Sequence, residues 1–296
     1  MAESSEKIRE KTRVVRANAI DFHVLEMGAG PLVLCLHGFP DTAHSFRHQM
    51  PMLAAAGFHA VAPFMRGYAP SGAAPDGRYD IAALAEDALA LIDALGATDA
   101  ILFGHDWGAT AVYEAAAAAP KKVRKLIASA VPYGPQIIQA LATNYAQQKR
   151  SWYMYFFQSA IAEMSVALND FAFLEKIWAD WSPSWKWAPE DMEALKRCFR
   201  AVGTTGAALG YYRATLGPLF RPPAPDATPP VAPQPIEVPA MMLHGRNDGC
   251  IGVELIDGMA DYFPRGLKVE IIEGAGHFVH QEKPLQVNKL ITDFLK

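Results

Sequence analysis

The sequence offers no candidate for a membrane span, because none of its apolar runs reaches the ~18 residues that a transmembrane helix needs. The opening segment, MAESSEKIREK, is polar and charged and is not followed by the apolar core of a secretion signal. Cysteine is scarce: Cys35, Cys198 and Cys250 cannot all pair and lack the spacing of metal ligands. We therefore expect a reduced, cytoplasmic setting, no membrane partner and no bound metal.

An excess of charge of one sign is also lacking. The 27 basic and 31 acidic residues give a formal net charge of -4. This balance gives no reason to expect a nucleic-acid partner, which would favour a strongly basic surface. No cofactor is expected, and the oligomeric state is left open with a homodimer as one alternative.

What the chain does contain is an alternation of short apolar runs and longer helix-like stretches. Near-continuous apolar runs bounded by Gly, Pro or Asp are typical of buried parallel strands. They cover 22–27, 32–37, 58–64, 100–104, 125–131, 240–245 and 268–274. Helical patterns cover 81–96 and 107–119. The alternation predicts an α/β protein with a mostly parallel twisted sheet flanked by helices.

The alternation stops after about residue 132. Residues 133–216 are rich in Trp, Tyr and Phe and have a helical pattern, which predicts an inserted helical cap domain. Nine of the 22 prolines then fall between Pro218 and Pro239, so this stretch continues neither a helix nor a central strand. We expect a catalytic domain built from 1–132 and 236–296, with 217–235 as a Pro-rich connector from the cap.

The most informative turn is Gly104-His105-Asp106-Trp107-Gly108, which lies between an apolar strand and a helical pattern. The related G-x-S-x-G turn exposes its central side chain at the top of a sheet, and small flanking residues make that tight turn sterically accessible. Here aspartate occupies the central position. The alternative interpretation is that Asp106 merely caps the helix that follows.

An aspartate at this position restricts the chemistry. A carboxylate is ionised at neutral pH and needs no base to become a nucleophile. Its attack on an sp3 carbon gives an alkyl ester that water can cleave, whereas a serine would form a stable ether. Asp106 therefore points to strained or activated carbon electrophiles such as epoxides and alkyl halides.

Cleavage of the ester requires a general base, and His277 is the candidate. It follows the apolar run 268–274 in a Gly-rich loop, whereas the competing His280 lies where the last helix begins. Asp248 also follows a strand pattern and can orient the imidazole, although an Asn-Asp-Gly aspartate can simply form a turn. The order Asp106, Asp248, His277 is the nucleophile–acid–histidine order of the α/β-hydrolase fold.

Two backbone N–H groups are expected to bind the oxyanion that forms when water attacks the ester. Trp107 follows the nucleophile and supplies one. The loop LHGFPDT, residues 36–42, follows an early strand and makes Phe39 the second donor. We expect His37 in this loop to support the loop rather than to react.

Taken together, these motifs resemble the epoxide hydrolases of the α/β-hydrolase superfamily. The matching segments are HGFPDT (37–42), FMRGYAPS (64–71), GHDWGA (104–109), HGRNDG (244–249) and GAGHFVHQEKP (274–284). The resemblance implies that two cap tyrosines protonate the epoxide oxygen as the ring opens. Tyr153 and Tyr212 are in the matching cap segments, with Tyr155 and Tyr211 as neighbouring alternatives.

The resulting hypothesis is hydrolysis of a small apolar or aromatic epoxide to a vicinal diol. The ester would form on Asp106, and His277 with Asp248 would activate the water. The expected substrate-binding residues are Phe39, Pro40, Trp107, Tyr153 and Tyr212.

Two other hypotheses remain open. Haloalkane and haloacid dehalogenases use the same aspartate, but many haloalkane dehalogenases carry Asn where this chain has Phe39, and fluoroacetate dehalogenases carry Arg at the position of Trp107. A non-catalytic binding protein of the same fold would lack members of the catalytic set, whereas none is missing here.

Overall fold

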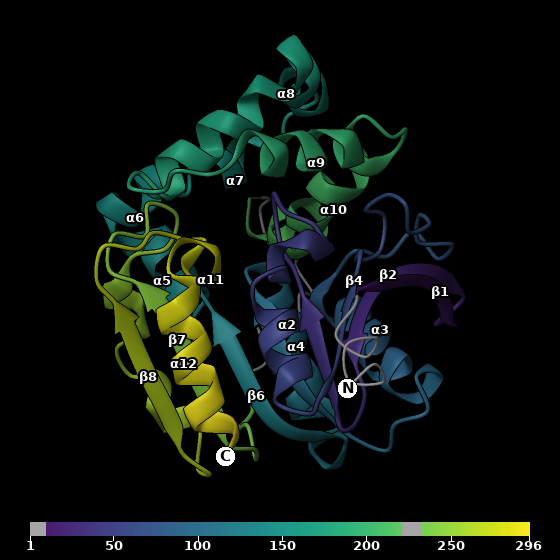
Figure 1. The fold of residues 1–296 in the computed structure, drawn as a ribbon. Helices are drawn as coiled ribbons and strands as arrows, with labels where there is room; N and C mark the ends of the chain where they lie inside the picture. The colour runs from purple at the N-terminus through teal and green to yellow at the C-terminus, as the bar shows by residue number, and fades with distance from the viewer. Residues whose placement is uncertain (1–9, 221–231) are drawn as a thin grey trace.

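The strands of the protein assemble into one sheet. A computed structural model describes residues 10–220 and 232–296, and within them the sheet has eight strands in the order β1-β2-β4-β3-β5-β6-β7-β8 (Figure 1). The strands are β1 (Lys11–Ala17), β2 (Ile20–Gly28), β3 (Leu32–Leu36), β4 (His59–Pro63), β5 (Ala100–His105), β6 (Val123–Ser129), β7 (Ala240–Gly245) and β8 (Leu267–Ile272). The predicted α/β-hydrolase architecture is confirmed.

The sheet is mostly parallel, as predicted, except at its amino-terminal edge. Strand β2, which covers the run 22–27, pairs antiparallel with both β1 and β4, while β3 to β8 run parallel. Its sequence carries the alternation of an antiparallel strand, since Ile20, Phe22 and Val24 are buried and Asp21 is exposed. Strand β1 escaped prediction because its edge position leaves most of its residues exposed.

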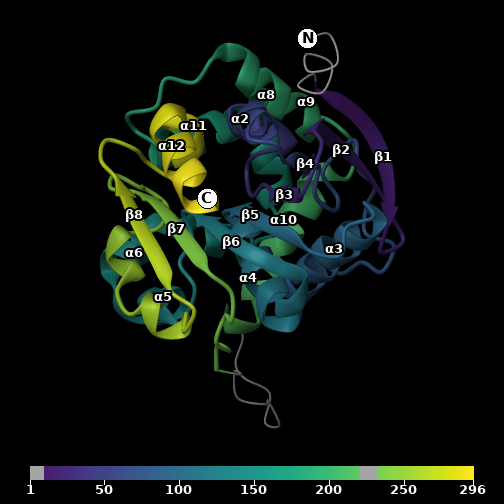
Figure 2. The same ribbon diagram turned by 60° about the horizontal axis from the view of Figure 1, so that its bottom comes forward.

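Helices cover both faces of the sheet. Figure 2 shows α2 (Gln49–Ala55), α11 (Val279–Glu282) and α12 (Pro284–Leu295) on one face, with α3 (Ile81–Ala94) and α4 (Trp107–Ala118) on the other. Short 3₁₀ turns are η1 (Ala43–Phe46), η2 (Pro120–Lys122), η3 (Gly217–Phe220), η4 (Val253–Ile256) and η5 (Met259–Tyr262). No helix in the described ranges is long and apolar enough to cross a membrane.

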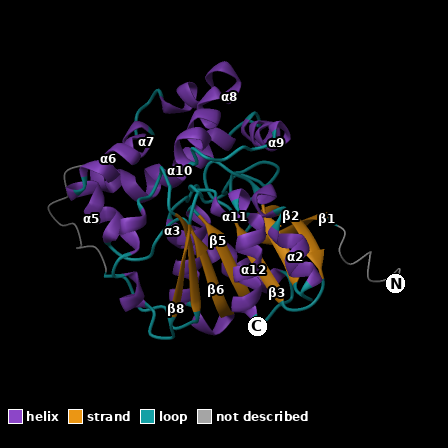
Figure 3. Ribbon diagram, turned by 60° about the vertical axis from the view of Figure 1, so that its left-hand side comes forward, coloured by secondary structure: helices purple, strands orange, loops and turns teal. Residues whose placement is uncertain are grey.

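The stretch between β6 and β7 is helical, as its pattern indicated. We call its helices the cap helices: α5 (Gln136–Thr143), α6 (Tyr145–Arg150), α7 (Trp152–Phe156), α8 (Ala162–Trp181), α9 (Pro189–Phe199) and α10 (Thr204–Leu216). Helices α7 to α10 lie beyond the carboxyl ends of the strands (Figure 3). The division into a catalytic domain, a cap of 133–216 and a connector stays a prediction, and residues 221–231 of the connector lie outside the described ranges.

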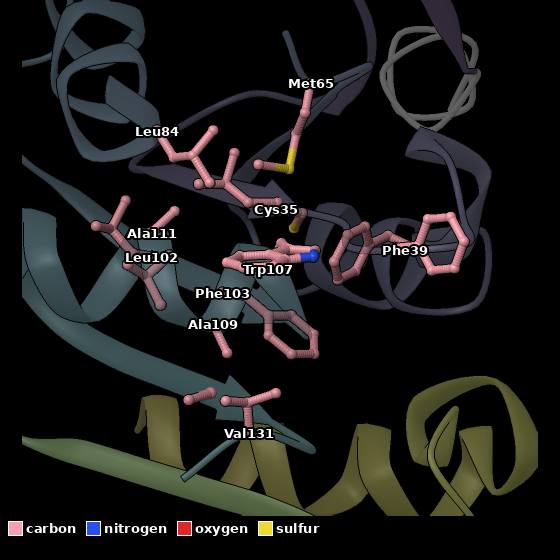
Figure 4. Close-up of a cluster of buried hydrophobic side chains, with 14 of the residues drawn as sticks. Cys35, Phe39, Met65, Leu84, Leu102, Phe103, Trp107, Ala109, Ala111 and Val131 are labelled. Carbon is pink, nitrogen blue, oxygen red and sulfur yellow. The ribbon is translucent and has the colours of Figure 1, made fainter. Parts of the chain in front are cut away.

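The central strands and the loops at their ends pack into a common core. Cys35 of β3 and Phe103 of β5 are fully buried, as is Phe39 in the loop after β3. Figure 4 shows these side chains in the same buried cluster as Trp107, the first residue of α4. The core therefore extends to the place where the predicted nucleophile turn begins.

A buried ion pair joins the loop after β4 to α3. The Arg66 guanidinium, in the loop after β4, donates two hydrogen bonds to Asp87 of α3, from Nε at 2.6 Å and from Nη2 at 2.7 Å. The Arg66 side chain is fully buried and that of Asp87 is 7% exposed. Asn18 also donates to Asp87 at 2.7 Å, and the backbone oxygen of Arg66 accepts a bond from Tyr211 of α10 at 2.8 Å. Arg66 thus links the sheet, α3 and a cap helix.

We expect Asp87→Ala to lower the free energy of unfolding by about 3–5 kcal/mol, because it removes the buried carboxylate that pairs with Arg66 and leaves only the partly exposed Asp76, whose Oδ1 is 3.4 Å from Nη1 of Arg66. Asp93→Ala on the same helix is the matched control, since its ion pair with Lys122 is exposed and is worth less than about 1 kcal/mol. Urea unfolding followed by circular dichroism measures both values. Equal losses in the two variants would contradict the structural role given to Arg66.

Candidate active site

Asp106 occupies the tip of the turn between β5 and α4 in a backbone conformation that is unusual for a residue with a side chain. Its φ is 52° and its ψ is -117°. The turn closes tightly, because a Cβ on Gly104 would collide with the backbone oxygen of Gly108, and one on Gly108 would collide with that of Leu36. The Asp106 side chain forms no capping bond to the first turn of α4, residues 107–110. The capping interpretation of this aspartate is therefore not supported.

The Asp106 carboxylate is held by the loop after β3. Its Oδ1 accepts a hydrogen bond from the backbone N–H of Phe39 at 2.7 Å. Trp107 is the first residue of α4, so its N–H has no partner inside the helix and belongs to the positive end of the helix dipole. Of the two predicted oxyanion donors, the Phe39 N–H therefore contacts the carboxylate, and the Trp107 N–H belongs to the next residue along the chain. His37 of the same loop accepts a bond from the Met65 N–H at 3.0 Å, which is a supporting role.

His277 lies between two carboxylates. Its Nδ1 is 2.9 Å from Oδ2 of Asp248, and its Nε2 is 3.5 Å from Oδ2 of Asp106. Asp248 is fixed in turn, because its Oδ1 accepts from the N–H groups of Cys250 at 2.7 Å and Ile251 at 2.9 Å. The competing His280 instead faces Ser45, with 2.6 Å from Nε2 to Oγ. The structure therefore brings Asp106, His277 and Asp248 together and leaves His280 outside this group.

The electrostatics of His277 depend on its neighbours. Burial alone would lower the pKa of this imidazole, but the negative charge of Asp248 and the nearby Asp106 carboxylate raise that pKa well above its usual value. The protonated imidazole is thus favoured while both carboxylates are ionised. A loss of the charge on Asp106 would remove part of this preference.

Two of the cap tyrosines point their rings toward the nucleophile turn. Tyr212 of α10 packs edge-on against Trp107 at 4.9 Å between ring centroids, and Tyr153 of α7 packs against Tyr212 at 5.6 Å. Among the described residues the buried Tyr212 hydroxyl has no hydrogen-bond partner, while that of Tyr153 is 3.2 Å from Sγ of Cys250. Burial, and next to it the Asp106 charge for Tyr212, raises the pKa of both phenols well above the usual value, so they stay neutral.

The neighbouring tyrosines lie elsewhere. Tyr211 donates its hydroxyl hydrogen to the backbone oxygen of Arg66 at 2.8 Å. Tyr155 is 41% exposed, and its hydroxyl is 3.4 Å from the backbone oxygen of Leu141. Both hydroxyls bind groups other than Asp106, so Tyr153 and Tyr212 remain the candidates for the cap proton donors.

A cavity of about 600 Å³ opens above Asp106. Its wall includes Trp107, Tyr153 and Tyr212 but neither Phe39 nor Pro40. Phe39 instead packs beneath Tyr212, at 5.4 Å between ring centroids, and the backbone oxygen of Pro40 accepts a bond from Trp178 at 2.9 Å. The cavity wall therefore does not include these two residues, which were predicted to contact the substrate directly.

Sequence reasoning missed part of this wall. Thr110 and Glu114 line the cavity from α4, and their spacing from Trp107 by three and seven residues could have indicated a shared helix face. The contact between Cys250 and Tyr153 has no comparable signal, because the two residues are far apart in the sequence.

One group of side chains in the described ranges has the composition of a cation site. Donor atoms of Asp248, Cys250 and His277 lie within 4.8 Å of one another. The Asp248 carboxylate already accepts two backbone N–H bonds and faces His277 Nδ1. This arrangement fixes the orientation of the imidazole.

Known proteins resemble this chain along nearly its whole length. The model of the alpha/beta hydrolase fold family matches residues 31–284. The chain is 31% identical to AB hydrolase superfamily protein YfhM of Bacillus subtilis, over 97% of this chain and 98% of that protein. It is also 31% identical to Epoxide hydrolase 3 of Xenopus tropicalis, over 95% of this chain and 76% of that protein.

A solved structure gives the same result. The epoxide hydrolase of Bacillus megaterium, in complex with an inhibitor, superposes with a TM-score of 0.84 at 31% identity, over 96% of this chain and 99% of that one. Together with the match of the family model, these similarities show that the chain belongs to the epoxide hydrolase family of the α/β-hydrolase superfamily.

Proposed function

We propose that the protein hydrolyses an epoxide to a vicinal diol through a covalent ester on Asp106. The observation that carries this proposal is the position of the Asp106 carboxylate, which lines the cavity and has its Oδ2 3.5 Å from His277. A nucleophile without a nearby base could form the ester but not release it. Membership of the epoxide hydrolase family supports the same chemistry.

In the first step Oδ2 of Asp106 attacks an epoxide carbon, and the bond from that carbon to the ring oxygen breaks. Oδ1 is the better carbonyl oxygen of the resulting ester, because it already accepts the Phe39 N–H. The departing ring oxygen takes a proton from Tyr212 or Tyr153. A neutral phenol is a suitable donor to a developing alkoxide.

In the second step water attacks Cγ of Asp106 and gives one proton to His277. Negative charge then develops on Oδ1, where the N–H groups of Phe39 and Trp107 stabilise it. The bond from Cγ to Oδ2 breaks, and the diol leaves with Oδ2 after taking the proton of the new carboxylic acid. The tyrosinate has already regained its proton from His277, and the proton from water restores the His277 imidazolium, so the net reaction is epoxide plus water to diol.

The charge on Asp106 coordinates the two steps. While Asp106 is ionised, it helps to keep the pKa of His277 raised. Esterification removes this negative charge, so the His277 imidazolium gives its proton to the tyrosinate left by ring opening and becomes the neutral base that accepts a proton from water. The base is therefore released when the intermediate that needs it has formed.

The cavity supports a small apolar or aromatic epoxide as substrate. Its volume of about 600 Å³ lies in the range of small-molecule sites. A relative, the F128A mutant of the Bacillus megaterium epoxide hydrolase, is complexed with its product (R)-3-[1]naphthyloxy-propane-1,2-diol. We infer that this chain accepts aryl epoxides of similar size. A cytoplasmic location and a homodimer stay predictions.

We predict that His277→Ala accumulates the ester when mixed with styrene oxide, because the variant forms the ester but cannot activate water. Intact-protein mass spectrometry should show a gain of one substrate mass, and peptide mapping should place it at Asp106. Asp106→Ala is the control and should carry no adduct. Continued turnover by an unmodified His277→Ala protein would contradict the two-step mechanism.

A single turnover in H2(18)O tests the same mechanism in the unaltered protein. We predict that the first diol carries the original Asp106 oxygen and that the heavy oxygen enters the Asp106 carboxylate. Mass spectrometry of the diol and of the Asp106 peptide measures both. Heavy oxygen in the first diol would mean direct attack of water on the epoxide.

We predict that Tyr212→Phe lowers kcat for styrene oxide by about 10²-fold, as expected for loss of a general acid. Tyr211→Phe is the matched control one residue away, because its hydroxyl binds Arg66 rather than the cavity, and its kcat should change by less than about threefold. Release of halide from simple alkyl halides, without diol formation from styrene oxide, would favour a dehalogenase instead.

A further inference from the structure

The cavity does not end at the nucleophile. From Asp106 its wall follows one face of α4 through Trp107, Thr110, Glu114 and the pair 117–118. These positions are separated by three, four, three and one residues, which places them on one side of a helix. A channel therefore runs along α4 and away from the reacting carboxylate.

The exposure of these residues gives the channel a direction. Trp107 is 7% exposed and Thr110 is half-buried, whereas Glu114 and Ala118 are exposed. With a rise of about 1.5 Å per residue, Ala118 lies roughly 16 Å along the helix from Trp107. The buried end holds Asp106 and the open end lies beside Glu114 and Ala118.

The opposite side of the channel is mostly apolar. Val131 and Tyr133 follow β6, and Ile137 and Ile138 belong to α5. Alanines at 117 and 118 leave space between α4 and this side, because their side chains end at Cβ. Such walls bind an apolar chain or ring and exclude only groups that are too large for the channel.

Charge is sparse along this channel. Of the described residues in its wall, Asp106 and Glu114 alone carry a charged side chain. None of the ion pairs within residues 10–220 and 232–296 includes Glu114. The mouth of an apolar channel thus presents a single negative charge.

We propose that this channel is a second subsite, which binds the distal arm of an elongated epoxide, and that Glu114 makes it select arms ending in an amine over arms ending in a carboxylate. This inference rests on the proposed function, because it needs an epoxide held at Asp106. The inference extends that function by specifying how long the preferred substrate is and which charge its far end carries.

Geometry sets the length of such a substrate. Eight residues of helix separate Asp106 from Glu114, which corresponds to about 12 Å along the axis. An extended chain covers roughly 3.5 Å for every three bonds, so about ten bonds reach from the reacting carbon to Glu114. An ammonium group at that end meets the carboxylate, whereas a carboxylate there is repelled.

The test uses three terminal epoxides with the same linear chain of about ten bonds, ending in a methyl, a primary ammonium or a carboxylate group. We expect kcat/KM of the unaltered protein to favour the ammonium over the carboxylate substrate by about fivefold, the size of an exposed ion pair. Glu114→Gln should bring this ratio close to one, and Glu114→Lys should invert it. Higher ionic strength should reduce the ratio in the unaltered protein.

Glu190→Lys is the matched control, because Glu190 is an exposed glutamate of α9 outside the cavity wall. It makes the same change in net charge and should keep the ratio of the unaltered protein. A ratio that is the same in Glu114→Lys as in the unaltered protein would overturn the proposal, and so would an equal change in Glu190→Lys. Failure of the proposed function is distinguishable, because it removes diol formation from styrene oxide and from all three substrates.

A second variant tests the channel without its charge. Ala117→Phe places a ring in the passage, so kcat/KM for the long methyl-ended epoxide should fall about tenfold relative to that for styrene oxide. An unchanged ratio between these two substrates would show that the long arm does not lie along α4.

Discussion

The structure of the site depends on the tight turn that displays Asp106. A residue with a side chain and a φ of 52° costs about 1–3 kcal/mol in backbone strain, which the surrounding contacts must offset. Those contacts are the close approach of Gly104 and Gly108 and the hydrogen bond from Phe39 to the carboxylate. The bond also selects which carboxylate oxygen is free to react. Strain and orientation therefore arise from the same few atoms.

Parallel strands explain how distant residues meet at this turn. The segments with Phe39, Asp106, Asp248 and His277 all follow the carboxyl ends of strands, and in a parallel sheet these ends share one edge. Sequence patterns therefore predicted both the central sheet and the group around Asp106. The pattern was less informative for β1, since an exposed edge strand has few buried residues to reveal it. The pattern was also less informative for the cap, because only the packing shows that Tyr212, and not Tyr211, lines the cavity.

The cavity wall was the least predictable part of the site. It combines one face of α4 with residues after β6, from α5 and from the cap helices. Whether such segments enclose space depends on how their side chains fill it, which no local pattern records. Phe39 shows the limit clearly, because its backbone N–H reaches Asp106 while its ring packs beneath Tyr212. A motif located the residue but not the direction of its side chain.

The cap helices are fastened to the body of the protein beside the site itself. The backbone oxygen of Trp181 at the end of α8 accepts hydrogen bonds from Gly249 and His277, both at 3.0 Å, and Tyr211 binds Arg66. A hinged opening of these helices would break bonds that position the imidazole and would expose a buried arginine. Solvent and product are therefore expected to diffuse through the channel along α4 rather than through a gap opened by movement of the cap helices.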